Sequence, residues 1–119
     1  MVERICWALL ALIHFAPFAA LFSPSMIERL YDIAPDGEAF PLLHHRAALF
    51  GCVVIVCGCA ALDPAVRQLA VMVTALSMVS FLAIYTMNGM PESLRTIAIA
   101  DAVGLPFLAY VAWRAFFPT

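Results

Sequence analysis

The sequence predicts an all-α fold, a bundle of four transmembrane helices that forms a single integral membrane domain over residues 1–119. Hydrophobic residues make up 66% of the chain and charged residues 12%, whereas soluble proteins are about 45–50% apolar. A soluble chain of 119 residues cannot bury so much apolar surface, so the bilayer must act as its solvent. Four stretches are long enough to cross a hydrocarbon core about 30 Å thick, which takes about 20 helical residues. The expected spans are residues 5–22, 43–62, 65–87 and 94–117.

The first span, residues 5–22, begins like a secretory signal peptide. Arg4 precedes an apolar run that ends in small residues at Ala19 and Ala20. This run is longer than the apolar core of a signal peptide, which has about 7–15 residues. We therefore expect a helix that is retained in the membrane.

A long extramembrane loop is expected between the first and second spans. Within it Ser25 and Glu28 have the S-x-x-E spacing of a capping box, in which both side chains satisfy free N–H groups at a helix start. This spacing predicts a short helix on the membrane surface, and an irregular loop with chance spacing is the alternative. The apolar side of that helix would contain Met26, Ile27, Leu30 and Tyr31.

Turn residues separate the last three spans. Asp63 is expected to cap the third helix and Pro64 to occupy its first turn, where a missing N–H costs nothing. The second and third spans should therefore form a tight antiparallel hairpin. Asn88 and Gly89 mark the end of the third helix, and Ser93 is a candidate N-cap for the fourth.

The charged residues argue against nucleic acid as a partner and balance the two sides of the membrane. The net charge is −2 and the six cations are separate arginines, so there is no basic surface for nucleic acid. Three arginines fall on each side, so the positive-inside rule does not choose an orientation. The acidic residues on the long-loop side favour an N-in, C-in arrangement with that loop outside. These acids are Glu28, Asp32, Asp36, Glu38 and Glu92.

Ionisable groups inside the spans mark the candidate functional site, because each is costly near the bilayer centre. At a rise of about 1.5 Å per residue, His14 lies about 12 Å below the end of the first span. Asp101 lies about 10–12 Å below the start of the fourth span, on the same side of the membrane. The other polar residues that enter from this side are His44, His45, Arg46, Tyr85 and Asn88.

We expect these groups to form one polar pocket in the outer half of the bundle. A carboxylate two turns deep needs a partner or a proton, and Arg46 or His14 would be the partner of Asp101. The alternative is that Arg46 extends to the lipid head groups and that the neighbouring histidines are interfacial. The predicted ligand-binding residues are Arg46, Asp101, His14, His44, Tyr85 and Asn88.

No cofactor or metal site is predicted. His14 is deep whereas His44 and His45 are near the surface, so axial ligation of one haem is awkward. The cysteines of the second span lack the C-x-x-C spacing of a reactive thiol pair, which disfavours electron exchange with a quinone. Haem and quinone stay open as alternatives. These cysteines are Cys52, Cys57 and Cys59.

Two short motifs resemble a large bacterial group of small four-helix membrane proteins, loosely DoxX-like. The second span opens with HRAALFG, residues 45–51, which matches an H-R-A-x-x-F-G pattern of that group. The last span contains ADAVG, residues 100–104, which matches A-D-x-x-G. The resemblance implies the four-helix architecture, a bacterial inner membrane and a role for Arg46 and Asp101, and it supplies no reaction. A DoxX-style redox role would require thiols that this sequence does not place suitably.

The sequence predicts a function in binding rather than in catalysis. The expected partners are membrane lipids and a lipid-like or other apolar ligand in the polar pocket. A role as an accessory subunit, in a homo-oligomer or a larger membrane complex, is also open. The alternative is a membrane-embedded acid/base enzyme, an isomerase, hydrolase or cyclase acting on an isoprenoid-like substrate. Its catalytic residues would be His14, Asp101 and Arg46.

Overall fold

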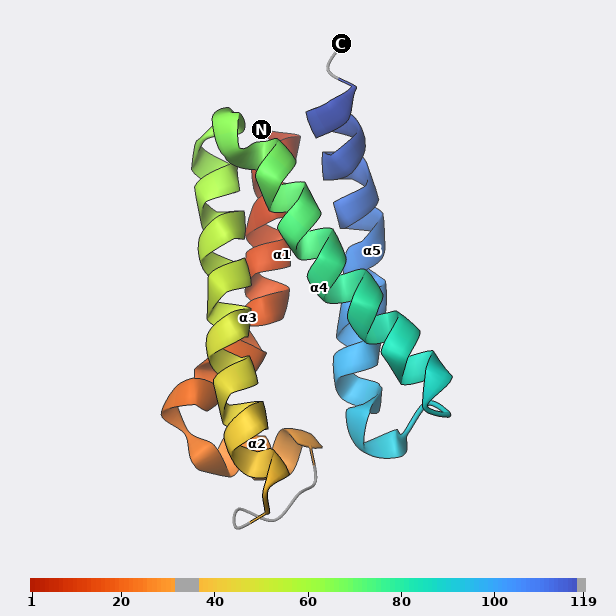
Figure 1. Cartoon of the computed structure of the whole chain (residues 1–119). Helices are drawn as coiled ribbons and strands as arrows, with labels where there is room; N and C mark the ends of the chain where they lie inside the picture. The colour runs from red at the N-terminus through yellow and green to blue at the C-terminus, as the bar shows by residue number, and fades with distance from the viewer. Residues whose placement is uncertain (32–36, 118–119) are drawn as a thin grey trace.

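The computed structural model describes residues 1–31 and 37–117, and every regular element in these ranges is a helix (Figure 1). Four helices, with their flanking 3-10 turns, contain 21 to 24 residues each and are apolar enough to cross a membrane. This confirms the predicted all-α fold and supports an integral membrane protein. The long helices are α1 (Val2–Ala19), α3 (Ala39–Leu62), α4 (Arg67–Met87) and α5 (Arg95–Phe116).

The connection between α1 and α3 contains the short helix that the sequence predicts, so little of its described part is loop. The 3-10 turn η1 (Ala20–Phe22) continues α1, and the short helix α2 (Pro24–Tyr31) follows it. Since α2 begins at Pro24, whose fixed φ suits a first helical position, Ser25 lies in the first turn and the predicted capping box is wrong. Ile27 is buried, as expected for the apolar side of this helix. Residues 32–36, with Asp32 and Asp36, lie outside the described residues.

The predicted hairpin between the second and third spans is confirmed. The Asp63 carboxylate accepts a hydrogen bond of 2.9 Å from the backbone N–H of Ala65. It caps a 3-10 turn, η2 (Pro64–Val66), which leads directly into α4. The chain therefore reverses direction with no free loop between the two helices.

The predicted end of the third span is correct, and the fourth helix begins within one residue of its predicted start, but its predicted N-cap is wrong. Helix α4 ends at Met87, and Gly89 adopts a φ of 79°, a left-handed conformation that glycine accepts readily. Ser93 lies inside the 3-10 turn η3 (Glu92–Leu94), so it does not cap α5, which begins at Arg95. The N-cap position of α5 is occupied by Leu94.

The two chain termini lie at one end of the bundle, and α2 lies at the other (Figure 1). We refer to these as the termini end and the loop end. Helix α1 packs against α3 and α5, and α4 packs against α3 and α5 on the other side. Figure 1 shows α4 starting beside α3 at the termini end and ending near α5 at the loop end, so α3 and α4 diverge toward the loop end.

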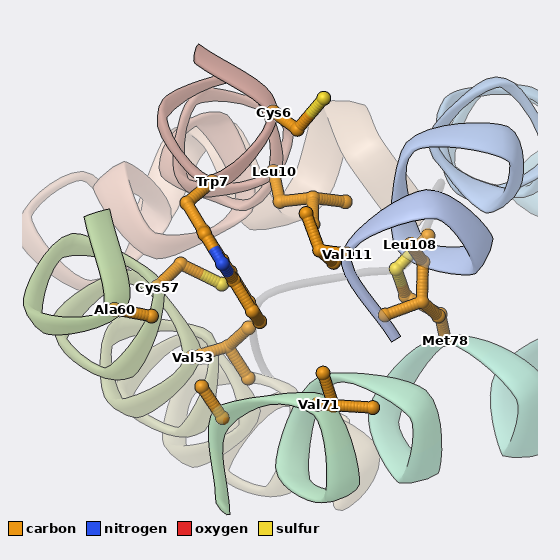
Figure 2. Packing of buried hydrophobic residues seen from close by; sticks show 11 residues of the cluster. Cys6, Trp7, Leu10, Val53, Cys57, Ala60, Val71, Met78, Leu108 and Val111 are labelled. Atoms are coloured by element: carbon orange, nitrogen blue, oxygen red, sulfur yellow. The ribbon is translucent and has the colours of Figure 1, made fainter. Parts of the chain in front are cut away.

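A hydrophobic core fills the half of the bundle nearer the termini end. Figure 2 shows side chains from all four long helices meeting there, with Trp7 and Leu10 of α1 fully buried between the other helices. A second, smaller cluster lies at the loop end, where Ile27 of α2 packs with residues of η1, α3, α4 and α5. Its other buried members are Ala20, Ala47, Phe81, Tyr85, Ile97 and Ala98.

Close contact between α1 and α3 depends on a glycine. A Cβ atom added at Gly51 would lie 2.5 Å from the ring of Phe18, far inside ordinary van der Waals distance. Gly58, two turns further along the same helix, has nothing within 4 Å of such an atom. Helix α3 therefore makes a close contact with α1 at Gly51, whereas the space around Gly58 is open.

Ionic contacts close the termini end. The Glu3 carboxylate accepts hydrogen bonds from Arg67 at 3.1 Å and from Arg114 at 3.2 Å, which joins α1, α4 and α5. Arg67 also donates to the carbonyl of Ala60 at 2.8 Å, which adds α3. All four long helices are therefore linked at this end through polar contacts.

Candidate functional site

An open groove lies between α3 and α4, where the two helices diverge toward the loop end. Its volume is about 630 Å³, within the range of about 300–1,000 Å³ that is typical of small-ligand sites. One wall comes from α3 and the other from α4, and the segment after α4 closes its outer end. The lining residues on α3 are Arg46, Leu49, Phe50, Cys52 and Val53. Those on α4 and beyond are Val73, Leu76, Ser77, Ser80, Phe81, Ile84, Tyr85, Asn88, Pro91 and Leu94.

The charged residue and the largest polar side chains of the lining lie at one end of the groove. Arg46, Tyr85 and Asn88 lie toward the loop end, whereas Val73 and Leu76 lie near the middle of the bundle. The α4 wall from Val73 to Asn88 extends about 22 Å, at about 1.5 Å per residue. The groove is therefore elongated along the helix axes and amphipathic along its length.

Arg46 is held at the polar end of the groove by aromatic rings. Its guanidinium carbon lies 5.2 Å from the ring centroid of Phe50 and 4.8 Å from that of Phe81, within the range of a cation–π interaction. The Phe50 ring lies 5.9 Å from His14, and the Phe81 ring stacks on Tyr85 at 6.1 Å. Arg46 is thus the centre of a ring layer that connects α1, α3 and α4.

Asp101 on α5 lies behind this layer and does not line the groove. Only 4% of its surface is exposed. Arg46 stabilises the carboxylate electrostatically, but within residues 1–31 and 37–117 Asp101 forms no hydrogen bond. The predicted pairing of Asp101 with Arg46 is therefore an interaction at a distance and not a direct salt bridge.

His14 is also buried behind the ring layer, with 1% of its surface exposed. Its Nδ1 donates a hydrogen bond of 2.8 Å to the carbonyl of Leu10, one turn earlier on α1. Its Nε2 has no hydrogen-bond partner in the described part of the chain. His14 reaches the groove only through its ring contact with Phe50.

The two histidines beside Arg46 lie on other faces of α3. His44 donates from Nε2 to the carbonyl of Leu21 at 2.8 Å and lies beside the ring of Phe40, so it contacts the α1 side of the bundle. His45 is exposed. Because successive helical residues point in different directions, three adjacent polar residues cannot share one site.

The six predicted site residues therefore do not share one pocket. Arg46, Tyr85 and Asn88 line the groove, whereas the remaining three lie behind it or on another face. The predicted site residues did not include Phe50 and Phe81, whose rings lie against Arg46. The available signal was the i, i+4 spacing of Arg46 with Phe50 and of Phe81 with Tyr85, which puts each pair on one helix face.

The described residues contain no group of three or more histidine, cysteine or carboxylate side chains that could hold a metal ion. Cys57 is buried, and its sulfur lies 3.3 Å from the Thr74 hydroxyl across the α3–α4 contact. Cys52 lines the groove, whereas Cys59 is exposed outside it. These thiols occupy three separate environments along one helix.

Together, the fold and the groove define a small four-helix membrane protein with an amphipathic groove beside a buried carboxylate. No protein-family model, curated protein or solved structure matches the chain. The resemblance to DoxX-like proteins therefore stays a prediction.

Proposed function

We propose that the protein binds a lipid-like amphiphile in the groove between α3 and α4. The observation that carries this proposal is the position of the charge in the groove, with Arg46, Tyr85 and Asn88 at the loop end and uncharged, mainly aliphatic residues toward the bundle centre. A lipid in the leaflet at the loop end has the same arrangement, with its polar head outside and its chain toward the bilayer centre. A bound amphiphile would therefore keep the orientation it has in the membrane.

The shape of the groove supports an extended chain. The α4 wall is about 22 Å long, comparable to more than half of a hydrocarbon core of about 30 Å. Leu49, Val53 and Leu76 supply apolar contacts along it, and Ser77 leaves room because its side chain is small. A single acyl or isoprenoid chain suits this groove better than a compact polar molecule.

The acid/base enzyme has less support. Such a reaction needs its acid and base within hydrogen-bonding reach of the substrate, directly or through one water. Of the three residues assigned to it, only Arg46 lines the groove, and His14 and Asp101 are 1% and 4% exposed behind the ring layer. An accessory-subunit role is a competing proposal, and a partner that co-purifies in fixed ratio would support it.

The proposal is tested by photolabelling with monoolein that carries a diazirine in its chain. We expect the label on peptides of α3 and α4 around Cys52 and Ser77, with competition by excess monoolein. Ser77→Phe should fill the groove and reduce this labelling strongly. Val79→Phe is the matched control, because Val79 is on the same helix, 53% exposed and outside the groove. Equal labelling of both variants, or labelling spread evenly over all lipid-facing residues, would contradict the proposal.

A further inference from the structure

We propose that the head of the bound amphiphile is an oxyanion, a carboxylate or a phosphate, which binds at Arg46 and Tyr85. This inference rests on the proposed function, since it names the chemical class of the ligand in the same groove. Three observations carry it: the charge of the lining, the hydrogen-bond donors at its polar end, and the rigidity of Arg46.

The groove presents a positive charge at its polar end. Arg46 is the only charged side chain among the described residues that line it. Asp101, the carboxylate that interacts electrostatically with Arg46, is 4% exposed and does not line the groove. A cationic head would meet the guanidinium directly, whereas an oxyanion would meet complementary charge.

Hydrogen-bond donors gather at the same end. Tyr85 is 7% exposed and lines the groove, and its hydroxyl has no hydrogen-bond partner among residues 1–31 and 37–117. This hydroxyl is not among the fully buried unpartnered atoms of the described residues, so it is accessible and can donate a hydrogen bond to a ligand oxygen. The amide nitrogen of Asn88 already donates to the carbonyl of Ile84 at 2.8 Å, so Tyr85 is the better donor.

The rings of Phe50 and Phe81 limit the motion of the guanidinium. The N–H donors of arginine lie in the plane of that group and match the two oxygens of a carboxylate or phosphate. Because the rings lie against the guanidinium, less side-chain entropy is lost when a ligand binds. The guanidinium of Arg46 is thus preorganised to bind an oxyanion at the polar end of the groove.

The test compares three amphiphiles with the same oleoyl chain: oleate, oleoyl lysophosphatidic acid and monoolein. Binding is measured by native mass spectrometry of the protein in uncharged detergent. We expect at least one of the two anions to bind at least about tenfold more tightly than monoolein, as charge-assisted hydrogen bonds allow. The anion that binds more tightly distinguishes a carboxylate head from a phosphate head.

Variants locate this preference on the protein. Arg46→Gln should abolish the preference for anions, so that oleate and oleoyl lysophosphatidic acid bind no more tightly than monoolein. Tyr85→Phe keeps the ring stacked on Phe81 and should weaken anion binding about two- to tenfold, the effect of one hydrogen bond. Arg95→Gln is the matched control, because this arginine is exposed at the same end and outside the groove.

The outcomes separate the two proposals. Equal binding of all three amphiphiles, sensitive to Ser77→Phe and insensitive to Arg46→Gln, would overturn the oxyanion head and leave the groove ligand standing. Binding that Ser77→Phe does not change would overturn the groove ligand itself. If Arg46→Gln does not fold, Tyr85→Phe decides, and unchanged anion preference in that variant would overturn the oxyanion head.

Discussion

The two ends of the bundle use their charged residues in different ways. At the termini end, one carboxylate, that of Glu3, binds both Arg67 and Arg114 within 3.2 Å and links three helices. At the loop end, Arg46 and Asp101 interact only at a distance, and Arg46 lies against aromatic rings at the mouth of a groove. The first arrangement pairs its charges directly, whereas the second places Arg46 among aromatic rings in the wall of a groove.

This difference indicates which end holds the structure and which end is available to a ligand. Direct ion pairs and a dense apolar core join all four helices near the termini, where α3 and α4 are closest. Toward the loop end the same two helices diverge, and polar side chains line the space between them.

The largest expected effect comes from breaking the ionic contacts of the termini end. Glu3→Gln removes the carboxylate that holds Arg67 and Arg114 together, and the three side chains are only 13 to 33% exposed. We expect a loss of about 2 kcal/mol in the free energy of unfolding, as for hydrogen bonds to charged groups. The measurement is the loss of helical circular dichroism during unfolding in mixed micelles with sodium dodecyl sulfate.

Glu92→Gln is the matched control for this change at the loop end. Its pair with Arg95 has side chains 87% and 63% exposed, so its loss should cost no more than about 0.5 kcal/mol. Equal destabilisation by the two variants would show that the termini end is not the more tightly held one.

A smaller effect is expected from the glycine that brings α1 against α3. Gly51→Ala would push a methyl group against the ring of Phe18 and should destabilise the protein by about 1–2 kcal/mol through overpacking. Gly58→Ala is the control on the same helix, where no atom lies within 4 Å and alanine is the better helix former. The same unfolding experiment measures both, and a loss of stability only in Gly58→Ala would contradict the assignment.

The spans were predictable from the sequence because composition and length alone decide which segments cross a membrane. The exact starts of the helices were harder to predict. Ser25 and Ser93 both match a capping pattern, but α2 begins one residue earlier, at Pro24, and Ser93 lies within a 3-10 turn. These local preferences differ by too little free energy to be ranked without the neighbouring contacts.

The sequence predicted the depth of the candidate site residues in the membrane, but not which side chains face the same space. Counting residues put Arg46, His14 and Asp101 at similar depth, and in the structure ring and electrostatic contacts link the three. Whether two groups at equal depth share a space depends on how far the helices diverge, and the sequence of one helix carries no information on that distance. The groove between α3 and α4 therefore could not be inferred before the structure.

The smallest expected effect concerns Asp101, the carboxylate that lies behind Arg46. Because its charge is opposite, the Asp101 carboxylate lowers the positive potential that Arg46 presents to the groove. Asp101 does not line the groove, so its replacement removes no ligand contact. Asp101→Asn should therefore tighten the binding of the preferred anion by a few fold and leave monoolein unchanged, measured by native mass spectrometry. Glu3→Gln should leave both affinities unchanged, because Glu3 lies at the other end of the bundle, further from Arg46 than the Debye length of about 8–10 Å. If Asp101 instead only positions Arg46, its removal would weaken anion binding as Arg46→Gln does, so the direction of the change decides between the two roles.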